Sequence, residues 1–328
     1  MSKLLSRATL SHASICSGIG GDLLAFEQAG VTARHHFISE IDSKAAQVLA
    51  LHFPNVPNIG NFNSQYWRDD ETPQIDILSC GLPGQAHSYA KGGQPSDASE
   101  ISPELLDFVE LCRPACVVIE SVKGSIGAEN GRHNRRLLRG LREAGYKTAQ
   151  ACLDARSFGA SIRSERVWTI GFLGPAGRGC GEIFSLAQGD ARRAAKGEKK
   201  RSRTTARPRA RTDILHPSAI GTLMASGAGM IRTAGFGGEL NSIIVQKLGR
   251  KIICRYPTRQ ECLRLQGFPE WWLDHIAEFP HREKLHACRL IGNAMQVQVA
   301  AFLFRRVALQ LLLAKAQEAK AHSEGQHK

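Results

Sequence analysis

The stretch HASICSGIGG, residues 12–21, decides the fold class, because a short apolar run ends there in a glycine turn. The next segment, DLLAFEQAG at residues 22–30, has apolar residues at helical spacing and closes on Gly30. Glycines between a strand and a helix let the backbone turn tightly and leave room for a ligand at the strand end. This stretch therefore predicts the first strand–turn–helix unit of an α/β fold.

The same alternation continues through about residue 175. Apolar runs predict further strands in four segments, residues 33–42, 74–81, 115–121 and 166–172. Helical spacing predicts helices between them, at residues 43–53, 103–112 and 134–146. Alternation of this kind favours a layered α/β fold with a parallel sheet and right-handed crossovers.

The pattern changes after that segment. Residues 175–250 are dominated by glycine, charge and short uneven apolar pieces, which predicts a small, irregular second domain. We expect residues 1–174 and 251–313 to form the first domain, because ordered amphipathic character returns at residue 251. Residues 314–328 are expected to be a polar, frayed tail.

Charge is unevenly spread along the chain. Its 328 residues include 43 Lys or Arg and 30 Asp or Glu, a net charge of +13. The segment RRAAKGEKKRSRTTARPRAR, residues 192–211, has ten basic residues and one acid, and therefore carries nine of those charges. Such a block is expected to be a solvated loop, and it favours a polyanionic partner such as nucleic acid.

Other classes of protein fit the composition less well. No apolar run reaches the roughly 20 residues that a membrane span needs, and the polar start is unlike a secretion signal, so we expect no membrane and a cytoplasmic protein. The nine cysteines lack framework spacing and are expected to be free thiols. Cys112 and Cys116 have no accompanying histidine pair, so no metal is expected.

Two carboxylates end predicted strands. Glu40 follows the glycine turn by about twenty residues, where a carboxylate can accept both ribose hydroxyls of a cofactor. From these residues alone, NAD and S-adenosylmethionine both remain open. Glu120 ends the run VVIES and should share the ligand-binding edge of the sheet with the loop at residues 80–85.

Ordered blocks between about residues 12 and 313 resemble the DNA (cytosine-5) methyltransferase family. CSGIGG (16–21) resembles the cofactor loop of the family, SEID (39–42) its ribose-binding block and GLPGQAHSYA (81–90) its catalytic loop. IESV (119–122) stands where the family has Glu-Asn-Val, and SIRSERVWTIG (161–171) where it has Pro-Gln-x-Arg-x-Arg and a strand. RYPTRQECLRLQGFPEWW (255–272) and LIGNAMQVQVA (290–300) are close to the two C-terminal blocks.

The resemblance implies a Rossmann-like, S-adenosylmethionine-dependent sheet, with residues 175–250 as the target-recognition domain. It also implies methyl transfer to carbon 5 of a cytosine that is swung out of double-stranded DNA. In the family a cysteine thiolate adds to ring carbon 6, while a glutamate acts at ring nitrogen 3. Carried over by position, Glu120 is that glutamate and Arg166 is the retained arginine of the Arg-x-Arg pair.

The resemblance also implies binding residues. The expected cofactor-binding residues are Cys16, Gly18, Ile19, Gly20, Glu40, Ile41, Asn61, Pro83 and Asn293. The expected DNA-binding residues are Gln85, Ser88, Arg192, Arg193, Lys199, Lys200, Arg201, Arg203 and Arg232. A monomer in the cytoplasm of a bacterial or phage-infected cell is expected, with a companion endonuclease of a restriction–modification pair left open.

One departure from the family concerns the reaction itself. Gly84 stands at the nucleophile position, and glycine has no side chain to add to carbon 6. Cys80 lies four residues earlier, on the order of 13 Å away if the chain is extended. Three alternatives follow: an impaired methyltransferase, an active one that uses Cys80 or an RNA substrate, or a non-catalytic DNA-binding or regulatory homologue.

Further positions also depart from the family. Ser121, Ile162 and Ser164 replace an asparagine, a glutamine and an arginine of the neighbouring blocks. Ile41 stands where an aromatic often covers the adenine, and Asn61 where an aspartate often meets its amino group. Several changes together favour relaxation in a prophage-like homologue over deliberate replacement of one cysteine.

Overall fold

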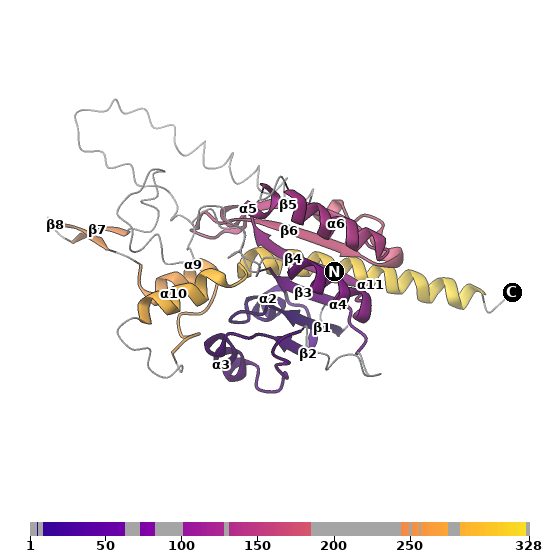
Figure 1. The fold of residues 1–328 in the computed structure, drawn as a ribbon, viewed down its shortest axis with the longest axis horizontal. Coiled ribbons are helices and arrows are strands. Elements are labelled where there is room, and N and C mark those ends of the chain that lie inside the picture. The colour runs from indigo at the N-terminus through magenta and orange to yellow at the C-terminus, as the bar shows by residue number, and fades with distance from the viewer. Residues whose placement is uncertain are drawn as a thin grey trace, which may run out of the picture.

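The computed structural model describes residues 5, 9–62, 73–82, 101–127, 131–184, 244–248, 251–255, 257–274 and 283–325. A six-stranded sheet in the order β2-β1-β3-β4-β6-β5 forms its centre (Figure 1). The strands are β1 (Leu10–Ile15), β2 (Ala33–Ser39), β3 (Ile77–Gly81), β4 (Cys116–Val122), β5 (Lys147–Asp154) and β6 (Glu165–Phe172). The strand–helix alternation places this sheet between helical layers, which confirms the expected Rossmann-like α/β class.

The sheet is mixed rather than wholly parallel. Strands β2, β1, β3 and β4 run parallel, but β6 pairs antiparallel with both β4 and β5. The expectation of a parallel sheet was therefore wrong at β6. Residues 155–164 join β5 directly to β6, with one short 3₁₀ turn, η6 (Ala155–Phe158), and a parallel crossover needs about a dozen residues or more.

Helices cover both faces of the sheet. On one face, α2 (Gly21–Ala29) and α11 (Val297–Gly325) pack against each other, with the rings of Phe26 and Phe304 stacked at 4.3 Å. On the other, α4 (Ile101–Cys112) and α6 (Arg132–Glu143) pack over β3 and β4. Neighbouring strand residues serve opposite faces: Val118 belongs to the α2–α11 core, and Val117 to the α4–α6 core.

The remaining elements include a second, two-stranded sheet. They are α3 (Ser43–His52), α5 (Gly124–Gly127), η7 (Gly174–Gly177), α9 (Arg259–Gln266), α10 (Glu283–Asn293) and a hairpin of β7 (Ile244–Leu248) and β8 (Lys251–Arg255). Local sequence explains several boundaries. Asp42 caps α3 through the N–H groups of Lys44 and Ala45, and Thr258 and Glu261 form a capping box on α9.

The segment directly after β6 packs against α11. Ala176, Cys180 and Phe184 are buried in the same core as α2 and α11. The Gln310 side chain of α11 donates to the carbonyls of Ala176 and Arg178 at 2.6 and 2.9 Å. The segment 174–184 therefore belongs to this core, and most of the expected target-recognition domain lies outside the described residues.

The C-terminal tail differs from the frayed segment that we expected. Helix α11 continues to Gly325, because residues 314–325 are rich in good helix formers and Lys320 pairs with Glu324 one turn on. The stretch Ala287–Glu324 is long and apolar enough to cross a bilayer by length and composition alone. Half of its most apolar window is buried, and Leu303 and Val307 lie in the core with α2, so it packs as a core helix.

Candidate functional site

The turn between β1 and α2 is held in an unusual backbone conformation. Cys16, Gly18 and Gly20 have φ of 52, 56 and 84°, the left-handed region that glycine tolerates best. A Cβ on Gly21 would lie 2.6 Å from the Met295 carbonyl oxygen. The glycines therefore let this turn lie directly against the turn that follows α10.

Glu40 joins the glycine turn to the loop after β2. Its Oε2 accepts from the Gly18 N–H and its Oε1 from the Asp42 N–H, both at 2.7 Å. Burial raises the pKa of Glu40, and these backbone donors oppose that rise. Each carboxylate oxygen keeps a further lone pair, so the group can still accept hydroxyls such as those of a ribose.

Other expected cofactor residues lie around the same edge. The Ile41 side chain is 78% exposed directly after Glu40, so an apolar surface is open to a ligand ring there. Asn61 is exposed beside Gly60, whose carbonyl accepts from Ser39 Oγ at 2.6 Å. Asn293 is exposed at the end of α10. The residue that follows it, Ala294, lies beside the glycine turn, because a Cβ on Gly18 would be 3.9 Å from the Ala294 Cα.

The Ile19 side chain is fully buried in the core with α2 and α11, so only its backbone can face a ligand at this turn. Its carbonyl accepts from Trp272 Nε1 at 2.9 Å, which fixes the glycine turn from behind. Cys16 is half-buried against the core on the other face of the sheet, under α4 and α6. Pro83 lies outside the described residues.

Sequence reasoning missed the residues that support this edge. The Asn58 side chain accepts from the Glu40 and Gly60 N–H groups and donates to the Glu40 carbonyl, all at 3.0 Å. Asp42 pairs with Arg289 of α10 at 2.9 Å. The signal for Asn58 was its place in the turn-rich segment PNVPNIGN, residues 54–61.

The block at residues 258–269 supports the turn after α10. Gln266 of α9 donates to the carbonyls of Ile291 and Ala294, each at 3.1 Å. Gln296 donates in return to the Leu265 carbonyl at 3.0 Å. These buried bonds hold the segment beside Gly18 in place.

Glu120 and Arg166 form a buried pair at the ends of neighbouring strands. Arg166 Nε lies 2.8 Å from Glu120 Oε1, an ion-pair contact without hydrogen-bond alignment. Both side chains are largely buried. Burial raises the pKa of Glu120 more than Arg166 lowers it. A carboxyl group of this kind can hold or donate a proton.

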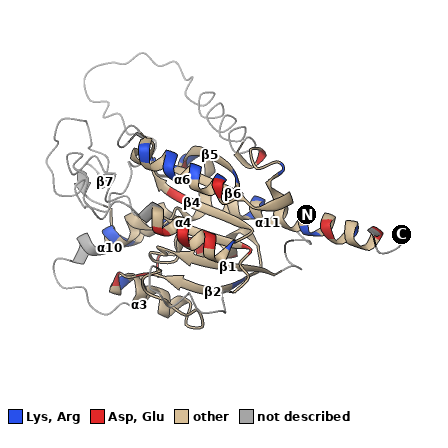
Figure 2. Cartoon of the chain, turned by 45° about the vertical axis from the view of Figure 1, so that its right-hand side comes forward, with Lys and Arg blue, Asp and Glu red and all other residues tan. Residues whose placement is uncertain are grey.

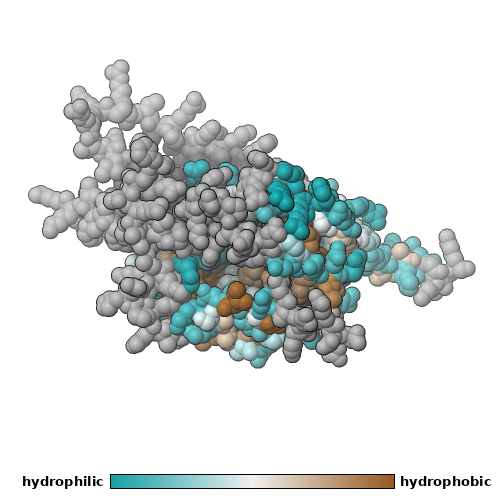
Figure 3. Space-filling model, in the orientation of Figure 1, coloured by the Kyte–Doolittle hydropathy of each residue, from teal (hydrophilic) through white to brown (hydrophobic). Residues whose placement is uncertain are grey.

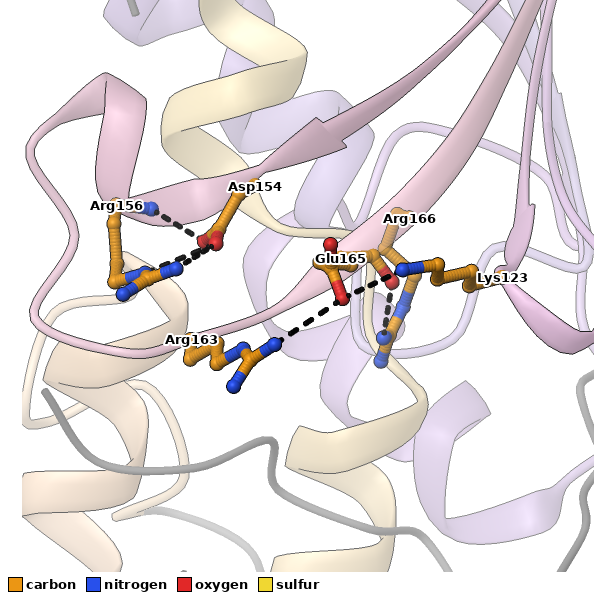
Figure 4. A network of polar contacts seen from close by, with 6 residues as sticks. All are labelled: Lys123, Asp154, Arg156, Arg163, Glu165 and Arg166. Carbon is orange, nitrogen blue, oxygen red and sulfur yellow. Dashed lines mark hydrogen bonds and ion pairs between the residues drawn. The ribbon is translucent and has the colours of Figure 1, made fainter. Parts of the chain in front are cut away.

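The rim beside this pair carries charge. Lys123 Nζ lies 3.0 Å from Glu165 Oε2, and Arg163 approaches the same oxygen at 3.9 Å (Figure 4). A separate pair joins Arg156 to Asp154 at 2.6 Å. Basic side chains are therefore exposed next to the buried carboxyl.

The three positions that depart from the family pattern near Glu120 have structural contacts of their own. Ile162 is fully buried in the core, and Ser164 is almost fully buried, with its carbonyl accepting from Ala155 N–H. Ser121 Oγ lies 3.0 Å from Ser125 Oγ, which ties the end of β4 to α5. Arg166 is therefore the residue of its block that reaches Glu120.

The loop that bears Gly84 begins beside Glu120. Leu82 N–H donates to the Glu120 carbonyl at 2.8 Å, two residues before Gly84. Cys80 is buried, and a hydrogen bond with Cys16 raises its pKa well above the ordinary thiol value, with burial and nearby charges adding to the rise. The thiolate is the nucleophilic form of cysteine, and a raised pKa favours the thiol.

Several expected site residues lie outside the described part of the chain. They are Pro83, Gly84, Gln85, Ser88, Arg192, Arg193, Lys199, Lys200, Arg201, Arg203 and Arg232. Among the residues that are described, no three His, Cys, Asp or Glu side chains gather as metal ligands would.

A buried polar network under the glycine turn was also missed. Asp22, at the start of α2, accepts from Ser14 Oγ at 2.6 Å and from Ser79 Oγ. Ser79 Oγ lies 2.8 Å from His12 Nε2, and His12 Nδ1 lies 2.8 Å from His35 Nδ1. Polar residues inside otherwise apolar strands were the available signal.

Comparison with known proteins agrees with this arrangement. The model of the C-5 cytosine-specific DNA methylase family matches residues 10–180 and 177–308. The type II methyltransferase M.NlaX of Neisseria lactamica is 34% identical over 159 residues, which are 48% of this chain and 50% of that protein. The matched region thus spans about half the length of such curated relatives.

Solved structures share the fold over almost the whole chain. The S. pombe Dnmt2 methyltransferase has a TM-score of 0.64 at 16% identity, covering 91% of this chain and 98% of its own. A proposed DNA modification methyltransferase encoded within an E. coli prophage has a TM-score of 0.55 at 18% identity, covering 93% and 99%. Because the family model matches most of the chain and the site blocks meet at one sheet edge, the chain belongs to the C-5 cytosine-specific DNA methylase family.

Proposed function

We propose that this chain binds S-adenosylmethionine and double-stranded DNA, receives a cytosine swung out of the duplex, and is impaired in methylating it. The observation that carries this proposal is the buried Glu120–Arg166 pair, with its raised carboxyl pKa, beside the start of the loop that bears Gly84. Membership of an enzymatic family supports the reaction class.

The residues of the cofactor edge fit an adenosyl group. Glu40 offers free carboxylate lone pairs, Ile41 offers exposed apolar surface, and Gly18 leaves the turn open toward Asn293. Bound there, the cofactor would supply a methyl group on a sulfonium centre. The protein holds and orients it through these residues.

In the base pocket, Glu120 would hold a proton at ring nitrogen 3, because burial raises its pKa and makes protonation easier than for an exposed glutamate. Arg166 would orient that carboxyl group and face the base from β6. Gly84 offers no thiol to add to carbon 6, so carbon 5 does not gain the electron density that methyl transfer requires. The buried Cys80 does not replace it.

The experiment is incubation with labelled S-adenosylmethionine and mixed-sequence DNA. The unaltered chain should leave little or no label on the DNA, and Gly84→Cys should raise labelling if Ser121 and Ser164 are tolerated. Gly84→Cys combined with Glu120→Gln is the matched control and should lose that gain. Robust methylation by the unaltered chain would defeat the proposal, and its loss in Cys80→Ser would then favour the rearranged nucleophile.

The setting of the protein is also a proposal. Relatives named as type II methyltransferases favour a restriction–modification context, and a prophage-encoded protein shares the fold. We therefore propose a cytoplasmic monomer in a bacterial or phage-infected cell.

A further inference from the structure

One face of α6 is lined with arginine. Its residues 133, 137 and 141 are buried, and they leave the other side of the helix to solvent. Five exposed side chains form what we call the arginine ridge: Arg132, Arg135, Arg136, Arg139 and Arg142. Glu143 is the helix's only acid. Figure 2 shows basic residues repeated along α6, and Figure 3 shows hydrophilic side chains gathered in this part of the surface.

The ridge begins at the edge of the sheet that carries the base pocket. Strand β4 ends at Val122, two residues after Glu120, and α5 connects it to the start of α6. The far end of α6 leads into β5 at Lys147. Lys147 pairs with Phe172 of β6, and Phe172 pairs with Cys116, the first residue of β4, at the end of that strand opposite to Glu120. The helix therefore runs from the pocket edge to the other edge of the sheet.

This concentration of charge is costly to the helix by itself. Like charges three or four residues apart repel each other on a helix surface. Helix α4 packs against α6, with Leu106 against Gly140, but no ion pair joins its acids to Arg132, Arg139 or Arg142 in the described part of the chain. A partner rich in negative charge would relieve this repulsion.

The spacing of the ridge suits a phosphate backbone. At 1.5 Å per residue, Arg132 and Arg139 lie roughly 10 Å apart along the helix, and Arg142 roughly 15 Å from Arg132. Duplex DNA rises about 3.4 Å per base pair on each strand, so the ridge spans about four to five base pairs. Guanidinium groups bind phosphate oxygens in a bidentate manner.

We propose that the arginine ridge is a second DNA contact surface, which holds phosphates of the duplex flanking the displaced cytosine. The inference rests on the proposed DNA binding, because it is the base pocket that places the duplex beside the start of α6. Electrostatic contact of this kind fixes position on the duplex without reading its sequence. The ridge would therefore lengthen the contact on one flank of the target.

The test measures how tightly the full chain binds a duplex of about 30 base pairs and mixed sequence. Affinity is measured between about 50 and 200 mM salt, a range in which phosphate contacts make affinity strongly salt-dependent. The variant is Arg132→Gln with Arg139→Gln. Loss of two phosphate contacts should reduce the slope of log affinity against log salt by about 1.8, so the affinity loss over this range should be about twelvefold smaller. Thermal unfolding verifies that the variant is folded.

Two controls separate charge at this place from charge in general. Arg132→Lys with Arg139→Lys keeps both charges and should keep the slope. Arg305→Gln with Lys320→Gln removes two exposed charges from α11, on the opposite face of the sheet, and should also leave it unchanged.

The outcomes distinguish the ridge from the proposed function. If the unaltered chain binds no duplex, the proposed function fails before the ridge is tested. If it binds and the glutamine variant keeps the full slope, or the lysine variant loses it, the ridge proposal is overturned. A slope that falls for duplex RNA and not for DNA would also overturn it.

Discussion

Arg166 on β6 places its Nε 2.8 Å from Oε1 of Glu120 on β4, although 46 positions separate them by number. The antiparallel pairing of these strands produces the contact, because Arg166 stands opposite Val122, two residues beyond Glu120. Because both side chains are buried, neither charge is well solvated, so each depends on the other for stabilisation. A parallel β6 would have carried Arg166 to the other edge of the sheet.

Arg166→Met should lower the free energy of unfolding by about 3 kcal/mol at neutral pH, because it leaves a buried carboxylate without its counter-charge. Denaturant unfolding measures the change. Arg166→Met combined with Glu120→Gln removes both charges and should recover part of the loss. An equal or greater loss in the double variant would mean that packing, and not charge, stabilises the pair.

The loss caused by Arg166→Met should also depend on pH. Burial raises the pKa of Glu120 above the ordinary value of 4.5, so the folded protein binds this proton more tightly than the unfolded chain does. The stability that this provides is present below the unfolded pKa and is lost as pH rises through the folded pKa. Without Arg166 the folded pKa rises further, so the loss should be smaller near pH 4 than near pH 8.

Glu40→Ala should weaken the binding of S-adenosylmethionine by roughly thirtyfold, about 2 kcal/mol for lost hydrogen bonds to a charged group. It removes the acceptor for the Gly18 and Asp42 N–H groups and for the ribose at once. Isothermal titration calorimetry measures the affinity. Glu27→Ala, an exposed acid on α2, is the matched control, and an equal loss there would contradict a specific role for Glu40.

Cys80 should resist alkylation in the folded protein. It is buried and its pKa is raised well above the ordinary thiol value. Burial also raises the pKa of Cys152 on β5, but that thiol is exposed and provides an internal comparison. Mass spectrometry after brief treatment with iodoacetamide at pH 7.5 should find Cys152 modified well before Cys80. Modification of both at similar rates would reopen Cys80 as a nucleophile.

Deleting residues 192–211 should flatten the salt dependence of DNA binding. The segment carries a net charge of +9, and each phosphate contact that it makes adds about 0.9 to the slope. The measurement is the same titration on the full chain and the deletion variant. An unchanged slope would show that this block does not contact the nucleic acid.

Much of the fold followed from sequence, because its strands are apolar and its turns are marked by glycine. Residues 22–30 and α2 agree closely, since Gly30 ends the helix with a left-handed φ of 65°. Strand β5 was missed because it is an edge strand with most of its side chains partly exposed, so no apolar run marks it. The direction of β6 depended on that missed strand.

The candidate site was predictable where a motif fixes the backbone. Gly18 and Glu40 were identified by their spacing, and the structure joins them by a 2.7 Å hydrogen bond. Ile19 was assigned by motif alone, and its side chain fills the core. Asn58 and Asp22 act through tertiary contacts that residue spacing does not encode.

Asp22→Ala should destabilise the fold by about 2 kcal/mol, because it leaves the buried hydroxyls of Ser14 and Ser79 without their acceptor. It also removes the acid from the first turn of α2, where a negative charge favours the helix. Asp22→Asn keeps an acceptor oxygen and should cost less than half as much. Denaturant unfolding of both variants tests the order, and if alanine proved as stable as asparagine, the network would contribute nothing beyond the space that it fills.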